Sequence, residues 1–147
     1  MKFDETIKEF YVEKEDVYNI STIDESDLTK TFGSNVDLDM ALKEKSQDVY
    51  MYLDDQQNVG DPYHHALAVR YMIYKNVDKQ TAIKRAVIEH IRGAVETGMD
   101  LEAYENEGKE WLSPKVKMIL KRSGLIVTGQ VRIPYFTLEG DWGAQAE

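Results

Sequence analysis

The amphipathic pattern of residues 79–97 constrains the fold of this chain more than any other feature. Apolar side chains recur there at the three- and four-residue spacing of an α-helix, and charged side chains occupy the opposite face. The apolar face consists of Ile83, Ala86, Val87, His90, Ile91, Ala94 and Val95. A helix of this kind buries one face against other elements. The pattern therefore predicts a helical core, in which this helix starts at a capping Asp78 and stops at Gly98.

A second long helix is predicted to start at Ser34 or Asn35 and to end near residues 56–58. Its apolar stripe is predicted to contain Leu38, Leu42, Val49 and Leu53, widened by Met40, Ala41 and Tyr52. We expect Leu42 and Val49 to pack in the core with the stripe of residues 79–97.

Two further helices are predicted from a capping residue followed by proline, a common way for a helix to begin. Asp61-Pro62 starts one of them, and its segment 66–74 is apolar nearly all round. Such a helix is buried on more than one side, by its own chain or by another copy. Ser113-Pro114 starts a shorter helix that stops at Gly124, with Val116, Ile119 and Leu120 inward.

The residue patterns at the two ends of the chain differ from the helical pattern of the middle. Near the N-terminus, residues 10–12 resemble a short strand, 13–20 a short helix with Val17 and Ile20 inward, and 24–30 another short helix. After residue 124 the apolar period becomes two, which indicates a hairpin or an extended arm, and Pro134 excludes a central strand position.

The predicted fold is mainly α: a small helical bundle of three main helices plus short ones, with an extended or β-hairpin C-terminal arm. We divide the chain into an acidic N-terminal lead (1–34), a helical core (35–124) and the arm (125–147). At 147 residues the chain has the size of one domain. Its apolar runs fall short of the roughly 20 residues that span a bilayer, and the N-terminus does not resemble a signal peptide. We therefore expect a soluble intracellular protein with no membrane partner, or part of an assembly built inside a cell.

The charge of the chain is unevenly distributed. The net charge is −9, and residues 1–60 account for all of it, with 6 Lys or Arg against 15 Asp or Glu. Residues 109–132 carry six basic side chains against one acidic side chain, a net of +5. Opposite charges at different places favour head-to-tail binding between copies, or binding of a charged partner. The overall negative charge argues against general DNA binding.

No pattern of catalytic residues is recognisable in the sequence. There is no cysteine, no glycine-rich phosphate loop and no nucleophile elbow. Asp61, His65 and His90 can be drawn as a metal site, but a histidine within a helical stripe is more often a hydrogen-bonded residue at the edge of the core. We predict no catalytic residue, no cofactor and no metal. A small metal-dependent hydrolase using His64, His65 or His90 is a weaker alternative.

From Leu38 to Gly124 the chain resembles phage head–tail connector, or adaptor, proteins, which complete the capsid head. The resemblance lies first in Ala41-Leu42, Val49 and Tyr52-Leu53, and then in Ala82-Ile83-Lys84-Arg85-Ala86 opening a helix that ends at Glu96-Thr97-Gly98. It lies most clearly in Leu112-Ser113-Pro114-Lys115-Val116, continued by Ile119-Leu120-Lys121 and Gly124-Leu125.

This resemblance implies a structural virion protein without catalytic residues. Such a subunit, assembled in the host cytoplasm, forms a homo-oligomeric ring, dodecameric by the resemblance, between the portal protein and tail or stopper proteins. DNA would pass through the ring without specific binding, and arms would grip neighbouring subunits. The partner interface is expected to include Lys115, Lys117, Lys121, Arg122, Arg132, Ile133, Tyr135, Phe136 and Trp142. The alternative from another class is an acidic phage-encoded inhibitor that imitates DNA and blocks a host nucleic-acid enzyme.

Overall fold

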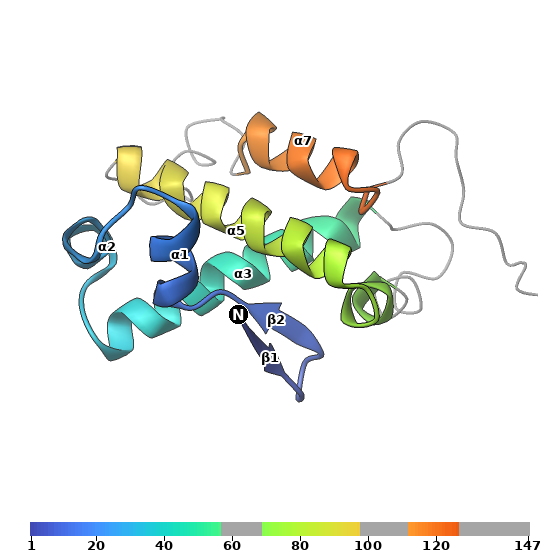
Figure 1. Cartoon of the computed structure of the whole chain (residues 1–147), viewed down its shortest axis with the longest axis horizontal. Coiled ribbons are helices and arrows are strands. Elements are labelled where there is room, and N and C mark those ends of the chain that lie inside the picture. The colour runs from blue at the N-terminus through green and yellow to red at the C-terminus, as the bar shows by residue number, and fades with distance from the viewer. Residues whose placement is uncertain (57–68, 98–111, 127–147) are drawn as a thin grey trace, which may run out of the picture.

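A computed structural model describes residues 1–56, 69–97 and 112–126 of the chain (Figure 1). The elements with both bounds described are β1 (Lys2–Asp4), β2 (Glu9–Tyr11), α1 (Lys14–Ile20), α2 (Glu25–Phe32), α3 (Val36–Gln56), α5 (Val77–Thr97) and α7 (Pro114–Arg122). Residues 69–74 are also helical. The predicted mainly-α class is confirmed. The predicted arm from residue 127 onward, the helix start at 61–62 and the stop at 98 lie outside the described residues.

Helix α5 lies at the centre of the bundle, because α1, α2, α3 and α7 all contact it. The predicted apolar face is confirmed: Ile83, Val87 and Ile91 are fully buried. The predicted capping residue, Asp78, lies two positions after the observed one. The side chain of Asn76 accepts hydrogen bonds from the backbone N–H groups of Asp78 (2.9 Å) and Lys79 (3.2 Å), so Asn76 caps the helix.

Helix α3 packs beside α5 through the predicted stripe, whose members Leu38, Leu42, Val49 and Leu53 are all buried. Two details differ from the prediction. Met40 was expected to widen the stripe, but its side chain is 58% exposed. Tyr50 was not placed in the stripe, yet it is buried, as is Ser46. Both of these buried polar side chains bond to the N-terminal hairpin, which the helical period of α3 does not reveal.

The N-terminal hairpin is antiparallel, with Phe3 opposite Phe10. Only its second strand was predicted. The segment 1–34 does not stand apart from the bundle, because its buried residues belong to the same core cluster: Val12, Val17, Ile23 and Leu28. Val17 is inward as predicted, whereas Ile20 at the end of α1 is 42% exposed and the prediction for it was wrong.

Helix α7 begins at the predicted cap, where the Ser113 hydroxyl accepts a hydrogen bond from the backbone N–H of Val116 (3.3 Å). Gly124 follows the helix with a φ of 81°, in the left-handed region that glycine adopts without strain. Leu125 and Ile126, which we assigned to the arm, are buried in the core instead. The bundle therefore continues at least to Ile126, beyond the predicted boundary.

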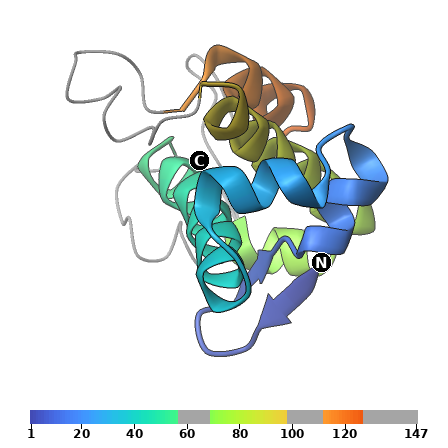
Figure 2. The same cartoon turned by 90° about the vertical axis from the view of Figure 1, so that its left-hand side faces the viewer.

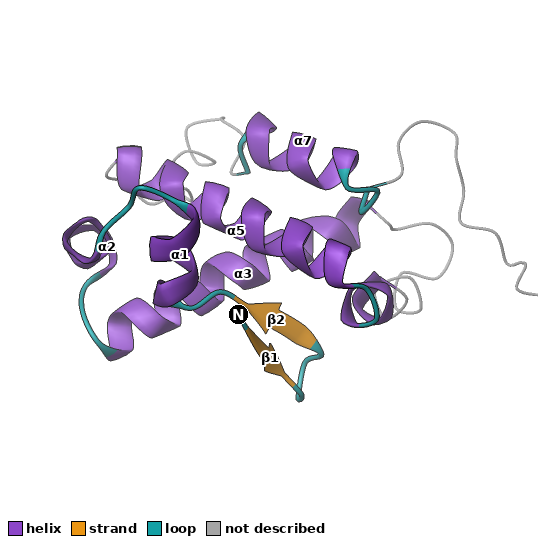
Figure 3. Cartoon of the chain, in the orientation of Figure 1, coloured by secondary structure: helices purple, strands orange, loops and turns teal. Residues whose placement is uncertain are grey.

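The hairpin and α7 lie on opposite sides of the layer formed by α3 and α5, as Figures 1 and 2 show from two directions. Figure 3 shows that the two strands form a small appendage on an otherwise helical fold. Within residues 1–56, 69–97 and 112–126, no helix has the length and apolar character that crossing a membrane requires.

Candidate functional site: an aromatic pocket and a basic helix

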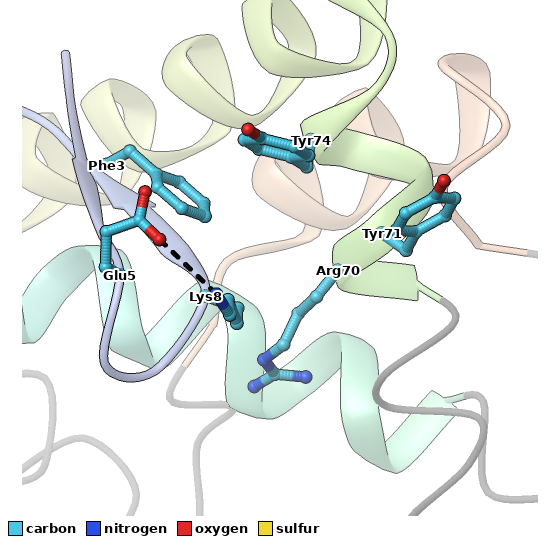
Figure 4. A pocket seen from close by; sticks show the side chains of 6 residues that line it. All are labelled: Phe3, Glu5, Lys8, Arg70, Tyr71 and Tyr74. Atoms are coloured by element: carbon cyan, nitrogen blue, oxygen red, sulfur yellow. Dashed lines mark hydrogen bonds and ion pairs between the residues drawn. The ribbon is translucent and has the colours of Figure 1, made fainter.

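A pocket of about 450 Å³ opens between the hairpin and the helix of residues 69–74 (Figure 4). Its lining consists of Phe3, Glu5, Lys8, Arg70, Tyr71 and Tyr74. Aromatic rings and basic groups thus share one concave surface. The volume falls within the range of small-molecule and side-chain binding sites.

The aromatic wall of the pocket is accessible. Tyr71 is 64% exposed and Tyr74 is 46% exposed, while Val69 and Ile73 on the other side of the same helical stretch are buried. Within a single chain, residues 69–74 are therefore buried on one side, and burial of the other side by another copy stays a prediction. The ring of Tyr74 lies 4.9 Å from the ring of Phe3, centroid to centroid. Exposed rings grouped in this way are typical of interaction surfaces.

Arg70 connects the pocket to the rest of the molecule. Its Nε donates to Glu9 Oε2 on β2 (3.1 Å), and its Nη1 and Nη2 donate to the two carboxylate oxygens of Asp54 on α3 (2.5 and 3.0 Å). Burial raises the pKa of Glu9, against the opposing effect of the Arg70 hydrogen bonds. Burial lowers the pKa of Arg70, but hydrogen bonds to Asp54 and Glu9 outweigh it and leave the pKa raised. Arg70 thus bridges strand and helix as a charged group.

Two buried side chains of α3 complete the attachment of the hairpin. The Tyr50 hydroxyl accepts a hydrogen bond from the backbone N–H of Phe10 (3.2 Å), and the Ser46 hydroxyl accepts one from Val12 (3.0 Å). Burial raises the pKa of Tyr50 to about 12. The Arg70 guanidinium carbon lies 5.3 Å from the Tyr50 ring centroid, which places a cation over the ring. The hairpin side of the pocket is therefore fixed by polar bonds.

Charged groups of both signs lie at or beside the pocket, because Glu5 and Lys8 line it and Lys75 lies beside the tyrosine rings. Lys75 Nζ lies 5.5 Å from the Tyr71 ring centroid and 5.7 Å from that of Tyr74. Lys8 pairs with Glu5 across 3.3 Å at the turn of the hairpin. The lining thus offers exposed rings and a paired Lys8 and Glu5 on one surface.

The predicted basic interface residues lie on α7, on the other side of the bundle. Lys115 is exposed and pairs with Glu89 of α5 (3.5 Å), and Lys117 Nζ lies 5.4 Å from the ring centroid of Tyr52 on α3. Lys121 and Arg122 are exposed in the last turn. The remaining predicted interface residues lie outside the described residues: Arg132, Ile133, Tyr135, Phe136 and Trp142.

The histidines give no metal site within the described part of the chain. His90 is buried, and its Nε2 lies 2.9 Å from Asp48 Oδ2, so it is a hydrogen-bonded core residue as the sequence indicated. His64 and His65 lie outside the described residues. Among residues 1–56, 69–97 and 112–126, no three His, Cys, Asp or Glu side chains come together in a way that could hold a metal ion.

No protein-family model, curated protein or solved structure matches the chain significantly. The role of the site can therefore be inferred only from the positions and chemistry of its own residues. The sequence patterns did not indicate the pocket. The first strand was not predicted, and so Phe3 and Lys8 could not be placed beside residues 70–74.

Proposed function

We propose that this protein is a structural subunit of a ring, in which each copy binds the next head to tail. The observation that supports this most is the presence of two accessible surfaces of different chemistry on opposite sides of the bundle. One is the aromatic pocket beside the hairpin, and the other is the basic outer face of α7. When one surface of a copy binds a different surface of the next copy, the contact is heterologous. Heterologous contacts form a closed ring when the rotation between successive copies adds up to a full turn.

The charge distribution supports the same proposal. Five exposed acidic side chains lie on α2 and around its ends and the start of α3: Asp24, Glu25, Asp27, Asp37 and Asp39. The exposed basic residues of α7 in one copy would face acidic residues of the next copy. Surface ion pairs of this kind are weakened by salt, since exposed charges are screened over roughly 8 Å at physiological ionic strength.

The specific assembly proposed from the sequence resemblance is the head–tail connector of a phage. The copies would form a dodecameric ring between the portal protein and tail or stopper proteins, with DNA passing through the lumen. The location would be the virion, after assembly in the host cytoplasm. The fold is compatible with this role, because a small helical bundle with accessible surfaces gains stability from neighbouring copies.

Light scattering of the full-length protein at low and high salt tests the proposal, together with images of the purified assemblies. We expect a closed ring at low salt and smaller species at high salt. The variant Lys121→Glu/Arg122→Glu should assemble poorly. The matched control Lys2→Glu/Lys30→Glu changes the net charge equally at exposed residues outside α7 and should assemble normally. A monomer at every salt concentration, or equal loss in both variants, would contradict the ring.

The alternative is an acidic inhibitor that imitates DNA, and the same five exposed carboxylates favour it. An inhibitor would bind a basic nucleic-acid enzyme as a monomer or dimer and would compete with DNA. In a competition assay against a basic DNA-binding protein, Asp24→Asn/Glu25→Gln/Asp27→Asn would then lose potency. A ring subunit without this activity would show no competition before or after the substitutions.

A further inference from the structure

We infer that the segment of residues 135–142 docks in the aromatic pocket of its own chain, so that the pocket is closed from within. The inference goes beyond the proposed ring and does not depend on it. It follows from three observations: the exposed rings that line the pocket, the route from the end of α7 to the pocket, and the composition of the chain after residue 126.

The pocket presents aromatic surface that the described part of the chain leaves uncovered. Tyr71 and Tyr74 are 64% and 46% exposed, and the ring of Phe3 continues the same wall. Lys8 is paired with Glu5 across 3.3 Å, so its charge is neutralised within the chain. The occupant that this surface fits best is therefore a large aromatic or apolar side chain.

Side-chain contacts connect the end of α7 to the helix that carries the pocket tyrosines. The Lys79 side chain donates a hydrogen bond to the carbonyl of Ser123, just after α7. One residue further along α5, Gln80 Nε2 donates to the carbonyls of Ile73 (3.2 Å) and Tyr74 (3.0 Å). Figure 1 accordingly shows the end of α7, the start of α5 and the helix with the tyrosines at one end of the bundle. The chain after residue 126 therefore starts at the end of the bundle that holds the pocket.

Exposed apolar surface continues along this route, and the reach of the chain is sufficient. Val77, the first residue of α5, is 73% exposed and lies between Tyr74 and Lys79 in the chain. The eight residues from 127 to 134 span at most about 28 Å when extended. A 21-residue helix such as α5 is about 30 Å long. A reach of nearly the whole length of α5 is ample for a pocket at the near end of that helix.

The sequence after residue 126 supplies a suitable occupant. Tyr135, Phe136 and Trp142 lie within eight positions, with Leu138 between them. A pocket of about 450 Å³ has room for one or two side chains of this size. An aromatic ring that enters it would stack on exposed tyrosine rings and remove their apolar surface from water.

A segment of the same chain has an advantage over a second copy in reaching the pocket. A short flexible connection gives the segment an effective concentration in the mM range, whereas a separate chain present at about 1 μM is roughly a thousandfold more dilute. The same contacts therefore form first within one chain. One consequence rests on the proposed ring: a neighbouring copy would have to displace the segment before it could use the pocket, so docking would keep free subunits from joining through this surface.

Disulfide formation within one full-length chain tests the inference, because the natural chain contains no cysteine. Glu5→Cys marks the pocket and Thr137→Cys marks the segment, and neither substitution removes a ring. In the control chain Met51→Cys replaces Glu5→Cys, since Met51 is exposed on α3 outside the pocket. In dilute, high-salt solution we expect the intrachain disulfide to form at least about tenfold faster in the pocket chain. In urea the control chain should react at least as fast, because its loop is shorter.

A third chain separates contact with the rings from proximity alone. Adding Tyr71→Ser to the pocket pair should lower the rate of disulfide formation about tenfold, because an aromatic anchor of the contact is removed. Adding Met40→Ser, which removes an exposed apolar side chain of α3 outside the pocket, should leave the rate unchanged. Both positions are exposed, so neither substitution should disturb the fold.

The opposite results are equally clear. Equal rates for the pocket and control pairs in native buffer, or a rate indifferent to Tyr71→Ser, would overturn the inference. A disulfide that joins two chains, with a yield that rises with protein concentration, would also overturn it, because it would identify a second copy as the source of the segment. None of these results bears on the ring itself, which light scattering of the parent protein tests separately.

Discussion

Helix α5 and the N-terminal hairpin are attached to the molecule by different kinds of interaction. Helix α5 contributes a continuous apolar stripe, in which Ile83, Val87 and Ile91 are fully buried. The hairpin is attached to α3 and to the helix of residues 69–74 by polar side chains, among them Tyr50 and Arg70, as well as by ring contacts such as Phe3 with Tyr74. Apolar burial depends on area and tolerates small displacements, whereas hydrogen bonds require particular atoms within about 3 Å. The central helix therefore sets the stability of the fold, and the hairpin sets the shape of the pocket.

The largest loss of stability is expected from a substitution in the buried apolar stripe of α5. Ile91→Asp puts a carboxylate into a fully buried position of α5, and we expect it to reduce the free energy of unfolding by about 4 kcal/mol or more. The midpoint of chemical denaturation measures the change. Thr81→Asp, at an exposed position of the same helix, is the control and should change stability little. Equal stability of both variants would show that the buried stripe does not dominate.

The next largest effect is expected from Arg70→Met, which keeps much of the side-chain volume but removes the guanidinium. The variant should lose about 3 kcal/mol, because it leaves the Glu9 carboxylate buried without its cationic partner. Glu9→Gln added to this variant should recover part of the loss. Burial already raises the pKa of Glu9. Without Arg70, the Glu9 carboxylate of the folded state would bind its proton still more tightly. The loss of unfolding free energy in the variant should therefore shrink as the pH falls and grow as the pH rises through the pKa of Glu9.

A smaller effect is expected from Tyr50→Phe, which keeps the buried ring and removes the acceptor for the N–H of Phe10. The loss should be about 1–2 kcal/mol at neutral pH. The absorbance of tyrosinate should also show one group with a pKa of about 12 in the parent and none in the variant. Because folding raises this pKa, the contribution of Tyr50 is complete below pH 10 and disappears as the pH rises through 12. A parent titration without that group would contradict the buried position.

The smallest effect is expected at the ion pair between Asp4 on the hairpin and Lys43 on α3, whose charged atoms are 2.9 Å apart. The hydrogen bond from Lys43 lowers the pKa of Asp4, and the same bond raises the pKa of Lys43. The pair therefore stabilises the hairpin between about pH 4 and pH 10, and its contribution is lost on acidification and on strong alkalinisation. Asp4→Asn should speed amide hydrogen exchange in the hairpin slightly, with exchange in α5 unchanged.

The same comparison explains which parts of the fold could be predicted from the sequence. The stripe of α5 and the capping Ser113 of α7 depend on neighbours three or four residues away, so the local pattern contains them. The bonds that attach the hairpin join residues 34 to 61 positions apart. No local period indicates that Arg70 pairs with Glu9, and therefore neither the first strand nor the pocket could be predicted. Leu125 and Ile126 were misplaced for the same reason, since their apolar side chains suit an arm and a core equally.

The end of α7 also determines how the protein would respond to mechanical tension. The Lys79 side chain donates a hydrogen bond to the carbonyl of Ser123, and the backbone N–H groups of Leu125 and Ile126 both donate to the carbonyl of Leu120 (3.0 and 3.3 Å). A Cβ at residue 124 would lie 2.8 Å from the Lys79 Nζ, so glycine there preserves the contact. A pull on the chain after residue 126 would therefore act on α7 and the first turn of α5. The Gln80 side chain in that first turn donates to the carbonyls of Ile73 and Tyr74 (3.2 and 3.0 Å), so the pull would also reach the helix that carries the pocket tyrosines.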